Sequence, residues 1–465
     1  MAKHKTLHHG LRFTLAGMDA IVLGLLPAAL ILVAALTSIF FVRQQRPPES
    51  APAKPAAGFD LDVESSRAQM FDDGKRIFRY ETFGDEAFWG GTLRLHQAIA
   101  GEKNGGVGGG VSPKTALAVG LKVDADALPA DLVAQIKAGK VDLDDPATTL
   151  ALLKLNAVVG VTGRFDGAGQ LTSMGVQCAL CHSTVDDSFM PGIGRRRDGW
   201  PNRDLNIGGI IALAPNLQPI ADQLGVDVAT VKQVLASWGP GKYDAALNVD
   251  GKALRPDGKA AATLIPPAFG LAGVNNHTWS GSRGGIPYWN AFVAVTQMHG
   301  SGTFVDPRLA GEKIAAKTGL ANTHGKPDLV SEKLAPLHYY QLSLPAPRPA
   351  SGSFDAPAAE RGKALFAGKA QCATCHVPPL FTEPGWNLHA ASEIGVDDFQ
   401  AKRSPGEQKY RTAPLRGLFA HAKGGFYHDG RFATLDEVVE HYNRLRHLNL
   451  SAAEKNALVE FLRSL

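Results

Sequence analysis

The longest apolar stretch of the chain runs from Ala20 to Val42 and is flanked by the basic residues Arg12 and Arg43. About 20 apolar residues are needed to cross a bilayer, whereas the core of a cleavable export signal has about 7 to 15. The length therefore predicts an uncleaved transmembrane helix within residues 1–45. A cleaved export signal and a buried core helix stay open as alternatives.

Beyond this stretch, apolar residues recur mostly at helical spacing, and strand-like alternation is rare. Ser451, followed by Glu454, forms a capping box that predicts the start of the last helix. The pattern predicts a mainly α soluble part, with helices over 128–138, 331–344, 358–368 and 451–465.

Proline-rich segments divide the chain into regions. Residues 46–58 have the Pro/Ala composition of a semi-extended tether, and the run from Pro345 to Pro349 cannot continue a helix. We expect an anchor (1–45), the tether, an N-terminal extension of unknown role (59–160) and two compact domains (161–345 and 346–465).

Length and charge narrow the possible functions. A chain of 465 residues has room for two or three domains. Lys+Arg number 48 and Asp+Glu 44, so the net charge of +4 gives no sign of a large basic surface. Nucleic acid is therefore not an expected partner.

The four cysteines fall into two pairs with the same spacing. Both Cys178-Ala-Leu-Cys181-His182 and Cys372-Ala-Thr-Cys375-His376 have the C-x-x-C-H arrangement. In c-type cytochromes the two thiols bond covalently to haem, and the adjacent histidine binds the iron. The motifs predict two covalently bound c-type haems, with His182 and His376 as iron ligands.

Zinc binding and a redox dithiol are the two alternative uses of these cysteines. Two C-x-x-C pairs can supply four thiolates to zinc, but zinc gives no reason for a histidine directly after both pairs. A redox dithiol has no use for a second copy of the motif. Because c-type haem is attached after export, the haem reading places the soluble part in the periplasm, held to the inner membrane by a single N-terminal span.

The remaining iron ligands separate electron carriers from catalysts, because a six-coordinate haem passes electrons and an open iron binds oxidants. Ligand candidates for the second iron lie within 426–443. After His182, no histidine occurs before His277, and the nearest methionine is Met190. An open first iron is expected, with His277, Met298 or His299 as alternatives that would cap it.

Residues of the C-terminal half carry a family resemblance. The run from Tyr410 to Gly417, the sequence His428-Asp-Gly and the run from Thr434 to Val439, together with both haem motifs, resemble the bacterial dihaem cytochrome c peroxidase and MauG superfamily. The resemblance covers about residues 160–465.

The resemblance implies an axial ligand for the second iron. In this family it lies fourteen residues after the histidine of His428-Asp-Gly, which here is Tyr442. A phenolate ligand would lower the haem potential and favour oxidised iron. His441 and His447 are rival ligands, and simple packing of the Tyr442 ring is the other alternative.

The resemblance also implies catalytic roles. Trp279-Ser-Gly is similar to the family segment whose tryptophan lies between the haems, so Trp279 is the expected electron bridge, or else a core residue. The family's distal Gln, Pro and Glu set is not reproduced. His299 lies near the position of the Glu and is the expected acid/base group, with a structural histidine as the alternative.

Calcium, which the family binds between its haems, is doubtful because Ile265-Pro266-Pro267 replaces the expected pattern.

Three functions follow, in order of preference. The first is a peroxidase-like oxidoreductase that reduces hydrogen peroxide with electrons from a cytochrome or a quinone-linked donor. The second is a dihaem oxygenase or MauG-like oxidant that acts on an organic or protein substrate, using peroxide or oxygen. The third is an electron-transfer cytochrome without catalysis.

Overall fold

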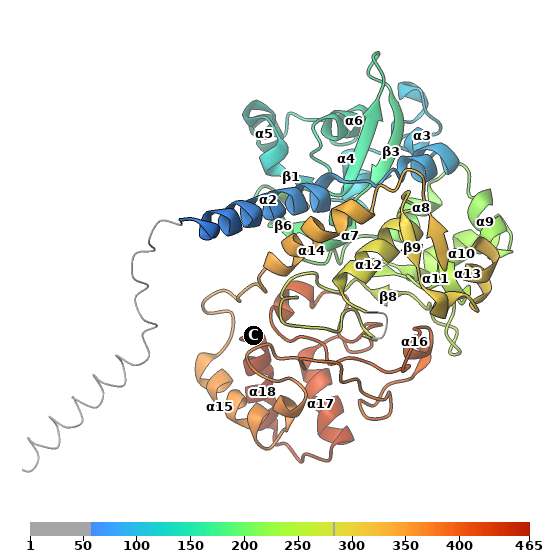
Figure 1. Cartoon of the computed structure of the whole chain (residues 1–465). Helices are drawn as coiled ribbons and strands as arrows, with labels where there is room; N and C mark the ends of the chain where they lie inside the picture. The colour runs from blue at the N-terminus through green and yellow to red at the C-terminus, as the bar shows by residue number, and fades with distance from the viewer. Residues whose placement is uncertain (1–56, 282–283) are drawn as a thin grey trace, which may run out of the picture. The chain divides into compact units, whose positions relative to one another are not determined.

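The computed structural model describes residues 57–281 and 284–465 (Figure 1). The predicted anchor, residues 1–45, and most of the predicted tether lie outside these ranges. Within them, no helix is both long enough and apolar enough to cross a bilayer. The chain divides into two units, Met1–Ser65 and Ser66–Leu465. Both candidate haem sites belong to the second unit.

Helices make up most of the regular structure in the described ranges, which confirms the mainly helical prediction. The longer helices are α2 (Phe59–Tyr80), α10 (Val228–Trp238), α14 (Leu334–Ser343), α15 (Ala356–Ala367), α17 (Leu435–Leu445) and α18 (Ala452–Arg463). The shorter ones are α3 (Leu95–Ala100), α4 (Pro113–Ala118), α5 (Ala130–Lys137), α6 (Pro146–Lys154), α7 (Cys178–His182), α8 (Ile207–Ala212), α9 (Gln218–Leu224), α11 (Leu247–Asp250), α12 (Ile286–Phe292), α13 (Lys313–Thr318) and α16 (Phe399–Lys402).

Short strands pair two by two and form no larger sheet in the described part of the chain. Strand β1 (Val123–Asp124) runs parallel to β5 (Ile193–Gly194). The antiparallel pairs are β2 (Val161–Phe165) with β3 (Leu171–Val176), β4 (Ser183–Val185) with β6 (Arg196–Asp198), β7 (Lys242–Tyr243) with β8 (Thr263–Leu264), and β9 (Thr303–Val305) with β10 (Asn322–His324).

The last helix begins where the sequence predicts. The Ser451 hydroxyl accepts a hydrogen bond from the Glu454 backbone amide, and the Glu454 carboxylate accepts one from the Ser451 amide. Each such cap contributes about 1 kcal/mol to helix stability. Helices α15, α17 and α18 lie together in the C-terminal part of the chain (Figure 1).

Buried apolar side chains form two main clusters. The first extends along the chain from Ile77 to Tyr340, and the second from Phe366 to Leu462. The segment 59–160 contributes fully buried side chains to the first cluster, among them Phe78, Leu93 and Leu95. This segment is therefore part of the packing around the first haem motif, while the predicted domain limits stay predictions.

Candidate functional site

The first C-x-x-C-H motif forms helix α7, directly after β3. The chain approaches it closely at Gly160, where a Cβ atom would lie 2.1 Å from the Cα of Leu180. Cys178, Cys181 and His182 all line one cavity of about 330 Å³. We refer to it below as the first cavity.

The chemistry of these three side chains follows from their enclosure. Removal from solvent raises the pKa of both Cys178 and Cys181 to about 12, so both thiols stay protonated. Burial also lowers the pKa of His182 to about 4, although the Pro266 carbonyl acts in the opposite direction. The imidazole is therefore neutral at neutral pH, which is the form that binds iron.

The second motif opens onto a separate cavity of about 230 Å³, the second cavity. Cys372 begins a single 3₁₀ turn, η7 (Cys372–Thr374), and Cys375 and His376 follow it. The Nδ1 atom of His376 lies 3.1 Å from the Phe381 carbonyl oxygen. A carbonyl only accepts, so Nδ1 carries the proton and Nε2 keeps a lone pair for a metal. Burial lowers the pKa of this imidazole to about 4.

The arrangement disfavours zinc as the bound group. The two cysteine pairs open into different cavities. Among the described residues, no cluster of potential metal ligands contains two cysteines. A four-thiolate site therefore does not form within the described part of the fold.

Two arginines at the second cavity fit a haem, which carries two propionate carboxylates. Arg203 is buried, and its Nε atom has no hydrogen-bond partner among the described residues. Burial lowers the pKa of both Arg203 and Arg411 to about 10, yet both guanidinium groups stay charged at neutral pH. Within the described ranges, neither forms an ion pair with a carboxylate of the chain. The cavity therefore offers positive charge to an anionic group, in addition to the two thiols and a neutral imidazole.

Trp279 forms part of the wall of both cavities, as does Arg411. The indole Nε1 donates to the Leu264 carbonyl at 2.9 Å. The Arg411 guanidinium donates to the carbonyls of Asn276 and Thr278, and its backbone amide donates to the Trp279 carbonyl. Trp279 therefore borders both cavities, while its role as an electron bridge stays a prediction.

Only some of the side chains that the sequence offers as iron ligands or catalytic groups line the first cavity. His277, Met298, Gln297 and Trp289 line the cavity, whereas His299 and Met190 do not belong to its wall. Gln297 is held in place because its Oε1 accepts from the Tyr243 hydroxyl and its Nε2 donates to the Ala245 carbonyl at 3.1 Å.

His299 instead packs on an aromatic ring. Its imidazole stacks on Phe88 with 3.6 Å between ring centroids and 16° between planes. The preceding turn is a π-helix, η4 (Val293–Gln297), and His299 has a left-handed backbone with φ of 64°. This local geometry directs the His299 side chain to Phe88, while residues 297 and 298 face the cavity. Sequence position alone does not reveal such a turn.

Tyr442 lines the second cavity from helix α17, and neither rival ligand does so. His441 Nε2 lies 2.8 Å from the Ile394 carbonyl oxygen, and His447 is exposed. Burial raises the pKa of Tyr442, whereas a hydrogen bond from Tyr427 lowers it. Of the three candidates in the sequence, Tyr442 alone faces the cavity that contains His376.

The structure also brings unpredicted residues to the two cavities. Arg411 lies inside the Tyr410–Gly417 motif, and the motif could have pointed to it. Arg203 and His389 line the second cavity without a motif of their own. Tyr243 lines the first cavity in the same way.

The doubt about calcium stays a prediction, and two observations in the described residues bear on it. Ile265, Pro266 and Pro267 line the first cavity, as the departure from the family pattern suggests. A cluster of Asp397, His428 and Asp429 has ligand atoms close together. Its carboxylates, however, accept hydrogen bonds from Arg255 and Arg431, whose positive charges occupy the place of a cation.

Comparisons with known proteins agree with the motifs. No family model matches the chain. The methylamine utilization protein MauG of Methylorubrum extorquens is 29% identical over 229 residues, covering 43% of this chain and 63% of MauG. The cytochrome-c peroxidase IdrP1 of Denitromonas iodatirespirans is 31% identical over 153 residues, covering 23% of this chain and 40% of the peroxidase. The chain therefore spans less than two thirds of either relative.

A solved structure of a MauG-like protein associated with microbial copper homeostasis is 19% identical, with a TM-score of 0.30 over 47% of this chain and 79% of that one. The MauG protein and the cytochrome-c peroxidase have different functions in their names. The motifs of this sequence resemble the superfamily that includes both. The chain is similar to members of the bacterial dihaem cytochrome c peroxidase and MauG superfamily, whose motifs its sequence resembles.

Proposed function

We propose that this protein is a dihaem c-type cytochrome of the periplasm, anchored to the inner membrane by residues 1–45, that reduces hydrogen peroxide. The observation that carries the proposal is the pair of cavities, each with its own C-x-x-C-H side chains and with Trp279 in the wall of both. Periplasmic location follows from the attachment of c-type haem after export.

The chemistry needs two electrons, because hydrogen peroxide takes up two electrons and two protons to give two water molecules. The haem irons supply one-electron transfer and a binding position for the oxidant. His182 and His376 would hold the two haems, and Tyr442 would be a further ligand at the second. Trp279, in the wall of both cavities, would connect the second site, which would receive electrons from a cytochrome or quinone-linked donor, with the first.

The chain's residues shape the first site for this reaction. Tyr243 and Gln297 hydrogen-bond to each other at the cavity wall. Burial raises the pKa of Tyr243, so the hydroxyl keeps its proton. His277 lines the same cavity, where burial lowers its pKa to about 4, and it is a neutral imidazole that can accept a proton.

The test combines spectroscopy with turnover. Electron paramagnetic resonance of the oxidised protein is expected to show one high-spin and one low-spin haem, and steady-state assays are expected to show peroxide-dependent oxidation of a reduced cytochrome. Two low-spin signals that persist after half-reduction, without turnover, would identify an electron carrier. Purified protein without the Soret band of covalent haem would contradict the proposal altogether.

One observation favours the second candidate, a dihaem oxygenase or MauG-like oxidant. Among the described residues, no Asp or Glu lines the first cavity, so a carboxylate acid/base group for peroxide is missing there. Much of its wall is apolar and comes from the 59–160 segment, namely Leu95, Ile99, Leu117, Leu121, Leu152 and Leu153. Oxygen-dependent conversion of an apolar organic substrate, without peroxide turnover, would select this candidate.

A further inference from the structure

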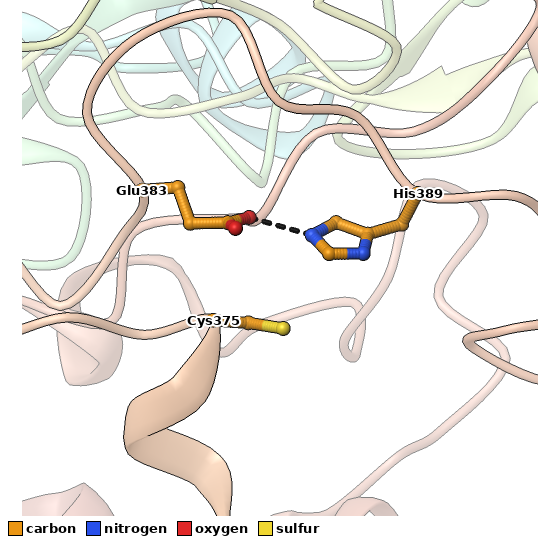
Figure 2. Close-up of side chains that lie close together, drawn as sticks. All are labelled: Cys375, Glu383 and His389. Carbon is orange, nitrogen blue, oxygen red and sulfur yellow. Dashed lines mark hydrogen bonds and ion pairs between the residues drawn. The ribbon is translucent and has the colours of Figure 1, made fainter.

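An imidazole held between two carboxylates lies beside the second haem motif. His389 Nε2 is 2.5 Å from Glu383 Oε2, and His389 Nδ1 is 2.9 Å from Glu393 Oε1. Figure 2 shows the contact between His389 and Glu383. The backbone amide of each of His389 and Tyr410 donates to the carbonyl of the other, which fixes the position of the ring. An ionised carboxylate only accepts, so this geometry favours an imidazolium with a proton on each nitrogen.

This cluster is close to the second haem attachment. The Cys375 sulfur and the facing atoms of Glu383 and His389 all lie within 4.8 Å of one another (Figure 2). Glu383 also accepts a hydrogen bond from the Thr412 hydroxyl. Both His389 and Thr412 line the second cavity.

A metal ion is not the natural occupant of this cluster, although its residue types suit one. Both nitrogens of His389 are engaged with carboxylates and offer no lone pair in the charged form. The Cys375 sulfur is the atom that the haem attachment uses. Proton binding is the chemistry that remains for Glu383, His389 and Glu393.

The cluster connects the cavity with solvent. The Glu393 side chain is 43% exposed, whereas His389 and Glu383 are 8% and 14% exposed. Glu393 is hydrogen-bonded to one nitrogen of His389, and Glu383 is hydrogen-bonded to the other. A proton that reaches Glu393 from water can therefore pass to His389, and through the imidazole to Glu383.

Charges around His389 set its proton affinity. Burial lowers the pKa of His389, but the two carboxylates outweigh burial and leave the pKa raised above its ordinary value. Arg446 lies 4.0 Å from Glu393, and Cys375 and His376 are the other titratable groups that sense the cluster. One more negative charge at the neighbouring iron would raise the proton affinity further.

We propose that Glu383, His389 and Glu393 form a proton-exchange site that takes up one proton when the second haem is reduced. The electron comes from a one-electron donor such as a reduced cytochrome and resides on the iron. At pH values above the raised pKa of His389, where its imidazole is neutral in the oxidised protein, the proton comes from water and forms an N–H bond on His389, and reoxidation releases it. The inference rests on the haem at Cys372–His376 that the proposed function requires, and does not depend on peroxide as the oxidant.

The test measures the midpoint potential of the second haem in the complete haem-loaded protein by spectroelectrochemistry between pH 6 and 10. The second-haem step is the one that shifts in Tyr442→Phe. Over the interval in which His389 titrates, the reduction equilibrium is expected to change up to tenfold per pH unit, which is about 59 mV for one electron.

Variants show whether the pH dependence of the midpoint potential comes from this site or from another histidine. His389→Gln and the nearly isosteric Glu383→Gln are expected to flatten the pH dependence. The matched control is His324→Gln, because His324 lies on β10 and its imidazole bonds to Asn322. This control is expected to keep the wild-type slope.

The outcomes are distinguishable from a failure of the proposed function. A second haem that is present but has a pH-independent potential contradicts the proton-exchange site alone. If both His389→Gln and Glu383→Gln keep the wild-type dependence of the midpoint potential on pH, the proton-exchange site is contradicted as well. Protein without covalent haem at Cys372 and Cys375 contradicts both proposals.

Discussion

At the scale of single residues, Tyr442 makes the sharpest prediction. Tyr442→Phe removes the phenolic oxygen that is expected to bind the second iron, so the low-spin signal of that haem should change while the signal of the first haem stays the same. Electron paramagnetic resonance measures both at once. An unaltered spectrum would exclude Tyr442 as a ligand and return His441 and His447 to consideration.

A second prediction compares how much the reaction with peroxide slows when His299 or His277 is replaced. Acid/base catalysis contributes about a hundredfold or more to the rate, so a residue with this role should cause a loss of that size when it is replaced. Because His299 stacks on Phe88 outside the first cavity, we expect His299→Ala to stay within about tenfold of the wild-type rate with peroxide. His277→Ala is expected to show the larger loss. Stopped-flow mixing with peroxide measures both, and a hundredfold loss in His299→Ala alone would restore the role predicted from its sequence position.

At the scale of elements, the contact between α15 and α18 depends on Gly362. A Cβ atom at this position would lie 1.9 Å from the Ala457 carbonyl oxygen. Gly362→Ala is therefore expected to cost about 1–3 kcal/mol of unfolding free energy through overpacking, despite the better helix propensity of alanine. Equilibrium unfolding in urea measures this loss of unfolding free energy. Gly311→Ala is the control, since a Cβ atom there meets nothing within 4 Å.

Elements were predictable from sequence wherever a local rule decides them. The start of α18 follows from Ser451 and Glu454, and the proline run ends α14 as expected. Counting along the chain brings His299 near the position of the family's Glu, but it does not reveal the π-helix and the left-handed residue that turn this side chain toward Phe88. The position of Arg203 depends on how distant segments pack, which a lone arginine does not signal.

At the scale of the whole molecule, acid should destabilise the fold through its buried neutral histidines. Burial lowers the pKa of His421 to about 3, compared with about 6.5 in an unfolded chain. Protonation therefore favours the unfolded state, so this contribution to stability is complete above pH 6.5 and is lost as the pH falls toward 3. At pH 5 the loss is about 2 kcal/mol for this residue.

Unfolding by urea at pH 7 and pH 5 measures this loss. His421→Gln, which cannot be protonated, is expected to show a smaller difference between the two pH values. His324→Gln, at an exposed position, should behave as the wild type does. A wild-type protein with equal stability at both pH values would contradict the assignment.

The proline run predicts a boundary between two domains, which stays a prediction; the two main buried clusters contain residues before and after this run, respectively. The extension at 59–160 was left without a role because apolar residues in separate short helices do not reveal, from sequence, that they line one cavity. Their contribution emerges only when α3, α4 and α6 pack around the first haem motif.

Trp279 precedes the proline run at 345–349, and Arg411, which donates hydrogen bonds to the carbonyls of Asn276, Thr278 and Trp279, follows it. Separately produced halves would thus each carry only part of the partition between the two chambers. We expect such halves to show the proposed peroxide turnover only when mixed, in the manner of split-enzyme complementation.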